Sequence, residues 1–219
     1  MRKFGIAMGG NEEPLENLIK QHISIQMRGA IYTAIEIGSA GCVSLRAFKD
    51  IISENTDKWR VHGFDLVDGW SLDFNKINEV FDGKPNILKV EDIAKDTDIN
   101  TMYLWLLDDP RSYIKNFPHK VNFAFIDGCH GANCVCKDFE ALENSVDIGG
   151  IVVFHDAGKS ETGQDWQHHC KEFINVRSGL MRLGLLDQTR KGWRIIGETN
   201  GSRNYGGDGN SCFITQKIE

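Results

Sequence analysis

The sequence predicts an α/β fold with a Rossmann-like, doubly wound and mostly parallel sheet of about seven strands, closed by a C-terminal antiparallel strand pair. Two observations lead to this prediction. Short, almost uninterrupted apolar runs, such as residues 121–126 and 149–154, are typical of parallel strands that are buried on both faces. Strand-like and helix-like segments also alternate along the chain, as helical crossovers between parallel strands require.

The first half of the chain supplies the first three strands. Asn11 is a candidate N-cap and Pro14 lies in the first turn of the helix that follows it. The predicted elements of this half are a helix at 11–28, a strand at 31–37, a helix at 44–52 and strands at 59–65 and 86–90.

The second half begins with a segment that is harder to assign. Polar residues and the pair Asp109-Pro110 interrupt the apolar pattern of residues 93–118, and we expect two short helices there. The elements predicted after it are a strand at 121–126, a helix at 133–144, a strand at 149–154, a mainly helical segment at 164–183 that ends near Gly184, and strands at 192–197 and 212–216. Residues 200–210 are rich in glycine, which is typical of a mobile loop.

The length of 219 residues suits one domain. Residues 1–30 are expected to form a helical cap, residues 31–156 the ligand-binding core, and residues 157–219 a lid helix and the closing strands.

The composition limits the cellular compartment and the binding partners that we expect for this protein. A net charge of −6 argues against a nucleic-acid backbone as the main partner. No apolar stretch approaches the roughly 20 residues that cross a bilayer, so no membrane partner is expected. The N-terminus lacks the apolar segment of a signal peptide, and the six cysteines are expected to be reduced thiols, so we expect a cytoplasmic protein. A homo-oligomer is compatible with all of these features.

Acidic and histidine side chains follow two of the predicted strands. Asp127 and His130 follow the strand at 121–126, and His155 and Asp156 follow the next strand. Ligands of open parallel sheets bind outside the carboxyl ends of the strands, so these four residues are expected to gather at one edge. Imidazole titrates near neutral pH, which makes both histidines candidates for acid–base catalysis. The chain is therefore expected to be an enzyme.

The loop after the first strand is a candidate binding site for a nucleotide. Glu36, Gly38 and Ser39 lie between a predicted strand and a predicted helix, where small residues let backbone N–H groups approach a ligand. The later glycines of the dinucleotide fingerprint are absent, and a carboxylate at Glu36 suits a positively charged ligand better than a pyrophosphate. Asp65 ends the next strand, where a carboxylate can accept hydrogen bonds from ribose hydroxyls.

Cys129, His130, Cys134 and Cys136 form a cluster that suggests a zinc site. Their Cys-x4-Cys-x-Cys spacing is not a usual structural-zinc pattern, and ordinary thiols are the expected outcome.

Taken together, these motifs resemble class I S-adenosylmethionine-dependent methyltransferases, in particular the small-molecule O-methyltransferase-like branch. The resemblance spans residues 31–156 and is carried by Glu36-Ile-Gly38-x-x-x-Cys42-x-Ser44, by Asp65, by Phe125-Ile-Asp127-Gly-Cys-His130 and by Gly149-Gly-Ile-Val-Val-Phe-His155-Asp156. It implies a methyl transfer from S-adenosylmethionine to a hydroxyl of a small molecule.

The resemblance also implies roles for individual residues. The expected cofactor-binding residues are Glu36, Gly38, Ser39 and Ser44 for the methionine part, Asp65 for the ribose, Glu91 and Asp92 near the adenine, and Asp127 near the transferred methyl group. In metal-dependent relatives, positions that match Asp127, His155 and Asp156 hold a divalent cation such as Mg²⁺. The acceptor pocket is expected from the segment after Asp156, the N-terminal helix and the loop near Tyr205.

The chain departs from the family pattern at three positions. Cys42 stands where the family usually has a glycine, Cys129 replaces an aspartate, and His155 stands where metal-dependent members carry an acidic residue. Two alternatives therefore stay open: an NAD-dependent oxidoreductase or epimerase, and a non-catalytic nucleotide-binding protein with a degenerate fold.

Overall fold

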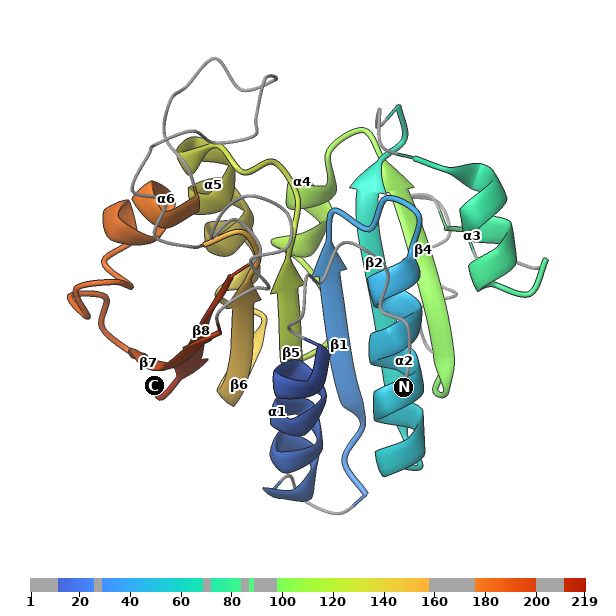
Figure 1. Cartoon of the computed structure of the whole chain (residues 1–219), viewed down its shortest axis with the longest axis horizontal. Coiled ribbons are helices and arrows are strands. Elements are labelled where there is room, and N and C mark those ends of the chain that lie inside the picture. The colour runs from blue at the N-terminus through green and yellow to red at the C-terminus, as the bar shows by residue number, and fades with distance from the viewer. Residues whose placement is uncertain are drawn as a thin grey trace.

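A computed structural model describes residues 12–25, 29–68, 72–83, 87–88, 98–157, 176–199 and 211–219. Within these residues a sheet of eight strands runs through the centre of the molecule, in the order β3-β4-β2-β1-β5-β6-β8-β7 (Figure 1). The strands are β1 (Tyr32–Ile37), β2 (Trp59–Leu66), β3 (Ile87–Leu88), β4 (Thr101–Leu107), β5 (Val121–Ile126), β6 (Val146–Phe154), β7 (Trp193–Thr199) and β8 (Cys212–Lys217).

Strands β1 to β6 pair with one another only in parallel, whereas β8 pairs antiparallel with both β6 and β7. The predicted fold class and the closing antiparallel pair are confirmed. On one side of β1 lies β2, then the edge strand β3, with the later β4 inserted between them; on the other side lie β5 and then β6. A switch point of the topology therefore lies at the carboxyl ends of β1 and β5, where open α/β sheets bind their ligands.

Helices cover both faces of the sheet and create two hydrophobic cores. The helices are α1 (Glu12–Ile25), α2 (Val43–Asn55), α3 (Phe74–Val80), α4 (Pro110–Ile114), α5 (Ala132–Leu142) and α6 (Val176–Arg182). One core joins α1, α2 and α3 to the face of the sheet that carries Phe123 and Phe125. The other joins α4, α5 and α6 to the face that carries Trp105 and Phe154. Alternate side chains of each strand thus enter opposite cores, which explains the continuous apolar runs in the sequence.

The prediction of two short helices at 93–118 was wrong. Within residues 98–118, the part of this range that the structure describes, residues 101–107 form β4, which lies between β3 and β2, and α4 is the one α-helix. Six consecutive residues of β4 are buried, with Tyr103 and Trp105 in one core and Leu106 in the other, so burial on both faces decides the conformation. Pro110 then begins α4, a position that proline tolerates because it needs no backbone N–H there.

The remaining predictions agree with the structure to within a few residues where they can be compared. Of the helix predicted at 164–183, only α6 lies among the described residues, and it is followed by Gly184 at a φ of +72°. Glu91, Asp92, Tyr205 and the loop at 200–210 lie outside the described residues. In the described part of the chain, no helix is both long enough and apolar enough to cross a membrane.

Candidate active site

Glu36 occupies the bottom of the site, near the end of β1. Its side chain is fully buried, and the register places it between Gly63 of β2 and Phe125 of β5. The hydroxyl of Ser44, in the first turn of α2, donates a hydrogen bond to Oε1, whereas Oε2 has no hydrogen-bond partner among the described residues. Burial raises the pKa of Glu36 to about 8. A buried carboxyl group with an unused acceptor atom is suited to a cationic or hydrogen-bond-donating ligand.

Gly38 brings the loop after β1 against the loop after β5. Its φ is +87°, and a Cβ atom there would lie 2.5 Å from the carbonyl oxygen of Asp127 and 2.6 Å from the Cα of Gly128. Only glycine satisfies both the left-handed backbone and this close approach. The predicted importance of Gly38 thus has a direct steric cause, which couples the nucleotide-type loop to the loop that carries Asp127.

Asp65, at the end of β2, is hydrogen-bonded to the loop that follows β1. Its Oδ2 accepts a hydrogen bond from the backbone N–H of Ala40 at 2.7 Å, and its Oδ1 accepts one from the N–H of Leu66 at 2.8 Å. The carboxylate remains partly exposed, and burial raises its pKa despite these hydrogen bonds. Its remaining lone pairs lie at the carboxyl edge of the sheet, where they can accept hydrogen bonds from hydroxyl groups.

Cys42 and Ser39 complete this loop. Cys42 is the N-cap residue of α2, makes no side-chain cap, and has a φ of +60°. A left-handed conformation explains why a glycine is usual at this position, and burial in the core explains how a cysteine side chain is accommodated. Ser39 is also buried, and its hydroxyl fills the space that Gly63 leaves open, because a Cβ at Gly63 would lie 2.5 Å from Ser39 Oγ.

The four predicted catalytic residues do meet at the carboxyl ends of β5 and β6. His155 Nδ1 lies 2.8 Å from Asp127 Oδ1. His130 Nε2 lies 3.4 Å from the same oxygen, and its Nδ1 lies 3.4 Å from Asp156 Oδ2. Asp127 is therefore flanked by two imidazoles, and His130 by two carboxylates.

The electrostatics of this group follow from the close pairing of opposite charges. Burial alone would raise the pKa of Asp127, but His155 and His130 hold it at about 2. Burial alone would lower the pKa of His155, but Asp127 raises it to about 9. The pKa of His130 is also raised by Asp127 and Asp156, against the effect of burial. At neutral pH the pair of His155 and Asp127 is an ion pair.

The side chains of His130 and His155 differ in their exposure to solvent. The side chain of His155 is 4% exposed, whereas His130, Asp127 and Asp156 are 20%, 15% and 24% exposed. Ligand atoms of Asp127, His130 and Asp156 all lie within 4.8 Å of one another. This group differs from the metal set expected from the sequence, because it contains His130 in place of His155.

Two features of the site were not predicted from the sequence. Asp108 and Asp109 follow β4, and they went unnoticed because that strand was not recognised, although Leu106-Leu107-Asp108 repeats the pattern of an apolar run that ends in an acid. Beneath the site, Arg111 Nε donates to the buried Asp138 Oδ1 at 2.6 Å and joins α4 to α5.

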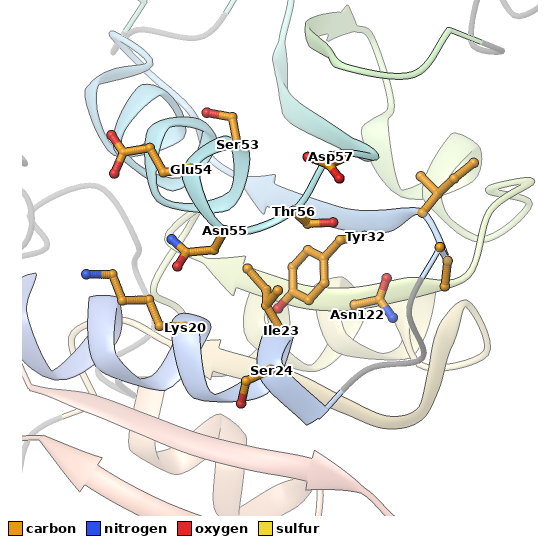
Figure 2. A pocket seen from close by; sticks show the side chains of 13 residues that line it. Lys20, Ile23, Ser24, Tyr32, Ser53, Glu54, Asn55, Thr56, Asp57 and Asn122 are labelled. Carbon is orange, nitrogen blue, oxygen red and sulfur yellow. The ribbon is translucent and has the colours of Figure 1, made fainter.

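A hollow of the described structure lies at the opposite edge of the sheet. Its volume is about 720 Å³, and it opens at the amino ends of β1 and β5, between α1 and the end of α2. Figure 2 shows its polar lining, which includes Lys20, Glu54, Asp57 and Asn122. None of the predicted site residues lines it, so the candidate active site rests on the chemistry at the opposite edge of the sheet.

Comparisons with known proteins identify the family of the chain and the proteins that share its fold. A family model described as a methyltransferase domain matches residues 35–157. No curated protein matches the chain. Over 94% of this chain and 80% of the other, the fold is similar to that of an O-methyltransferase from Bacillus cereus in complex with SAH, with 13% identity and a TM-score of 0.59.

Two further solved structures show how widely the fold is shared. The O-methyltransferase TomG from Streptomyces achromogenes, in complex with SAM, has 11% identity and a TM-score of 0.63 over 95% of this chain and 80% of its own. A fibrillarin/Nop5p complex has 14% identity and a TM-score of 0.53 over 93% of this chain and 81% of its own.

The matched residues begin within β1 and end directly after Asp156. They therefore include Glu36, Asp65 and the whole group around Asp127, and they make up more than half of the chain. The resemblance found in the sequence is confirmed: the chain belongs to the methyltransferase-domain family.

Proposed function

We propose that the protein transfers a methyl group from S-adenosylmethionine to a hydroxyl oxygen of a small molecule. One observation carries this proposal: three carboxyl groups, those of Glu36, Asp65 and Asp127, follow or end three adjacent parallel strands around the switch point of the sheet. The solved structures of similar fold that contain SAM or SAH support it, since they are O-methyltransferases.

The residues of the site fit the cofactor. The free Oε2 atom of Glu36 suits the ammonium group of the methionine part, and Gly38 lets the loop after β1 pack closely against the loop that carries Asp127. Asp65 is placed to accept hydrogen bonds from the ribose hydroxyls. Ser39 and Ser44 line the same loop, and the proposed role of Glu91 and Asp92 near the adenine concerns residues outside the described part.

The reaction needs little covalent chemistry from the protein. The C–S bond to the methyl group breaks, a C–O bond forms, the sulfonium becomes a neutral thioether, and the acceptor hydroxyl loses its proton. Positioning of the two reactants can lower the barrier by roughly 7–11 kcal/mol in well-oriented cases. Asp127, His130 and Asp156 are the partly exposed groups at the site that orient the acceptor, and the neutral form of His130 receives its proton.

His155 acts through Asp127. Its side chain is almost inaccessible, and its Nδ1 lies 2.8 Å from the Asp127 carboxylate. It is therefore proposed as a positioning residue that fixes the orientation and charge of Asp127, whereas His130 faces the acceptor.

The proposal is tested by incubating the full chain with methyl-labelled S-adenosylmethionine and a panel of small phenols, sugars and amines, with RNA as a separate arm. We expect label in an ether product, and an Asp127→Asn variant should lose this turnover while it still binds S-adenosylhomocysteine. Label in amines or RNA alone would contradict O-methylation of a small molecule. A net charge of −6 makes the RNA outcome unexpected.

Cys42 and Cys129 at family motif positions favour one second candidate, a nucleotide-binding protein that has lost the chemistry. That candidate predicts binding of S-adenosylhomocysteine without any turnover in the same panel.

A further inference from the structure

We propose that a second, smaller hollow, at the amino end of β5, binds a tetrahedral oxyanion such as a phosphate or sulfate group through Lys115, Lys120 and the hydroxyl of Ser145. The volume of this hollow is about 230 Å³. Its lining comes from the segment between α4 and β5 and from the two residues that precede β6. One water molecule takes about 30 Å³ of the liquid, so the hollow has room for a phosphate group and several waters.

The lining of this hollow is positively charged. Lys115 and Lys120 are exposed, and neither forms an ion pair with a carboxylate in the described part of the chain. Lys120 Nζ donates to the carbonyl oxygen of Asn144 at 3.4 Å, which is longer than a usual hydrogen bond. The described lining residues include no aspartate or glutamate. Two ammonium groups without a counter-charge suit a ligand with two negative charges.

Ser145 adds a buried donor to the lining. It is 6% exposed, and its hydroxyl has no hydrogen-bond partner among the residues that the structure describes. Its backbone is fixed, because its N–H donates to the carbonyl oxygen of Leu142 and its carbonyl accepts from the N–H of Val121, both at 2.9 Å. A buried hydroxyl without a partner costs free energy, which an acceptor oxygen in the hollow would recover.

A third ammonium group lies close to Lys120. Lys217 Nζ donates to the carbonyl oxygens of Glu143 and Val146, both at 3.0 Å, so it is held next to the residues that line the hollow. Burial lowers the pKa of Lys217, repulsion by Lys120 lowers it further, and the carboxylates of Glu143 and Asp147 offset the change only in part. An anion in the hollow would reduce the repulsion between these ammonium groups.

The lining also contacts a guanidinium group. Arg60, in β2, donates from Nη1 to Nδ1 of His119 at 3.3 Å, and His119 lines the hollow. A guanidinium has no acceptor atom, so Nδ1 accepts and the neutral ring carries its proton on Nε2. The ring packs edge to face on Phe117, another lining residue, with 5.4 Å between the ring centroids. Arg60 therefore adds a further positive charge beside the lining.

The hollow is separate from the candidate active site. Strand β5 has six residues, Val121–Ile126, and a strand of this length spans about 20 Å. The hollow lies before its first residue, whereas Asp127 follows its last. A ligand in the hollow is therefore too far away to be the methyl acceptor, and the inference goes beyond the proposed function.

The test uses the full chain in a buffer without phosphate or sulfate, at constant ionic strength. Inorganic phosphate, sulfate, acetate and glycerol 3-phosphate are each titrated by calorimetry. We expect one oxyanion per chain, with phosphate and sulfate bound at least about tenfold more tightly than acetate, because a doubly charged ion is attracted more strongly to two ammonium groups. The comparison of inorganic phosphate with glycerol 3-phosphate tells whether a free anion or a phosphate ester is the better ligand, and either order supports the site.

Variants in the lining make the test specific. Lys120→Gln and Ser145→Ala should each weaken phosphate binding by roughly tenfold, because each loses a hydrogen bond to a charged group. Lys137→Gln is the matched control, since Lys137 is exposed on α5 and does not line the hollow, and it should leave the affinity unchanged. Urea denaturation shows whether each variant keeps the stability of the unaltered chain.

The inference is overturned if phosphate and sulfate do not bind, or if Lys120→Gln or Ser145→Ala leaves their affinity unchanged. An equal loss in Lys137→Gln would also overturn it, because the binding would then reflect the charge of the chain and not this hollow. The proposed function is judged separately by titration with S-adenosylhomocysteine, whose outcome does not depend on the oxyanion.

Discussion

His155 and Asp127 form a buried ion pair that joins the carboxyl ends of β5 and β6, with 2.8 Å between Nδ1 and Oδ1. Each residue changes the titration of the other, since the pKa of Asp127 falls to about 2 and that of His155 rises to about 9. The exposed part of the site, His130 and Asp156, is arranged around this pair. The ion pair thus links two strands, and it also sets the charges next to which His130 and Asp156 lie in the candidate active site.

The pair should make stability depend on pH in a defined window. The folded-state pKa of His155 is about 9 and its ordinary value is 6.5, so its contribution is fully present below pH 6.5 and is lost as pH rises towards 9. We predict that His155→Gln lowers the free energy of unfolding by about 3 kcal/mol at pH 6, and by much less at pH 9. Urea denaturation at several pH values measures this difference, with His119→Gln as control. A pH-independent difference would contradict the ion pair.

Glu36 should lower the stability of the ligand-free protein while it contributes to cofactor binding. Its folded-state pKa is about 8 against an ordinary value of 4.5, so the unfolded chain loses this proton first and the free energy of unfolding falls between pH 4.5 and pH 8. Glu36→Gln keeps the shape and an oxygen for the Ser44 hydrogen bond.

We therefore predict that Glu36→Gln stabilises the ligand-free protein at pH 8 by on the order of 3 kcal/mol, while it weakens binding of S-adenosylhomocysteine. Thermal or urea unfolding at pH 5 and pH 8 and a calorimetric titration check both parts. Equal stability of the two proteins at pH 8 would mean that Glu36 is not held in an apolar setting.

Gly38 provides a test of the contact between the two loops. Gly38→Ala introduces a Cβ atom 2.5 Å from a backbone oxygen at a positive φ, whereas Gly29 has a similar φ of +86° and no atom within 4 Å of an added Cβ. Gly29→Ala should cost about 1–2 kcal/mol for the left-handed backbone alone. Gly38→Ala should cost a further 1–3 kcal/mol or so for the clash, and it should also impair cofactor binding. Equal losses in the two variants would show that the loops can separate freely.

Arg111 and Asp138 should behave as a pair in which the half-buried guanidinium of Arg111 compensates the buried carboxylate of Asp138. Asp138 has a side-chain exposure of 4%, so Arg111→Met leaves a carboxylate without its partner and should destabilise the protein by about 2–4 kcal/mol. The double variant Arg111→Met, Asp138→Leu should recover most of this loss. Urea denaturation of the three variants forms a double-mutant cycle, and additive losses would argue against the pair.

Apolar runs followed by acids were sufficient to predict which acidic side chains meet at the carboxyl edge of the sheet. The strands before Asp65, Asp127 and Asp156 were recognised from their sequences, and the topology of parallel sheets then brought their ends together. β4 was missed because Asp109-Pro110 and the polar residues before it resemble a break in regular structure, whereas burial of both faces makes the segment a strand.

The roles of the two histidines could not be predicted from the sequence. His155 and Asp156 are neighbours in the chain, and the turn that buries one and exposes the other depends on the φ of +53° at Asp156. His130 lies three residues after Asp127, and its imidazole contacts both Asp127 and Asp156, which follow different strands. These are tertiary properties that residue spacing does not encode.

The most direct test of the central claim is a calorimetric titration of the full chain with S-adenosylhomocysteine, with NAD as the control ligand. We predict saturable binding of S-adenosylhomocysteine, no binding of NAD, and at least about tenfold weaker binding by Asp65→Ala, because two ribose hydrogen bonds to a charged acceptor are lost. Binding of NAD would favour an oxidoreductase, and absence of binding by both ligands would contradict the proposal that this site holds S-adenosylmethionine.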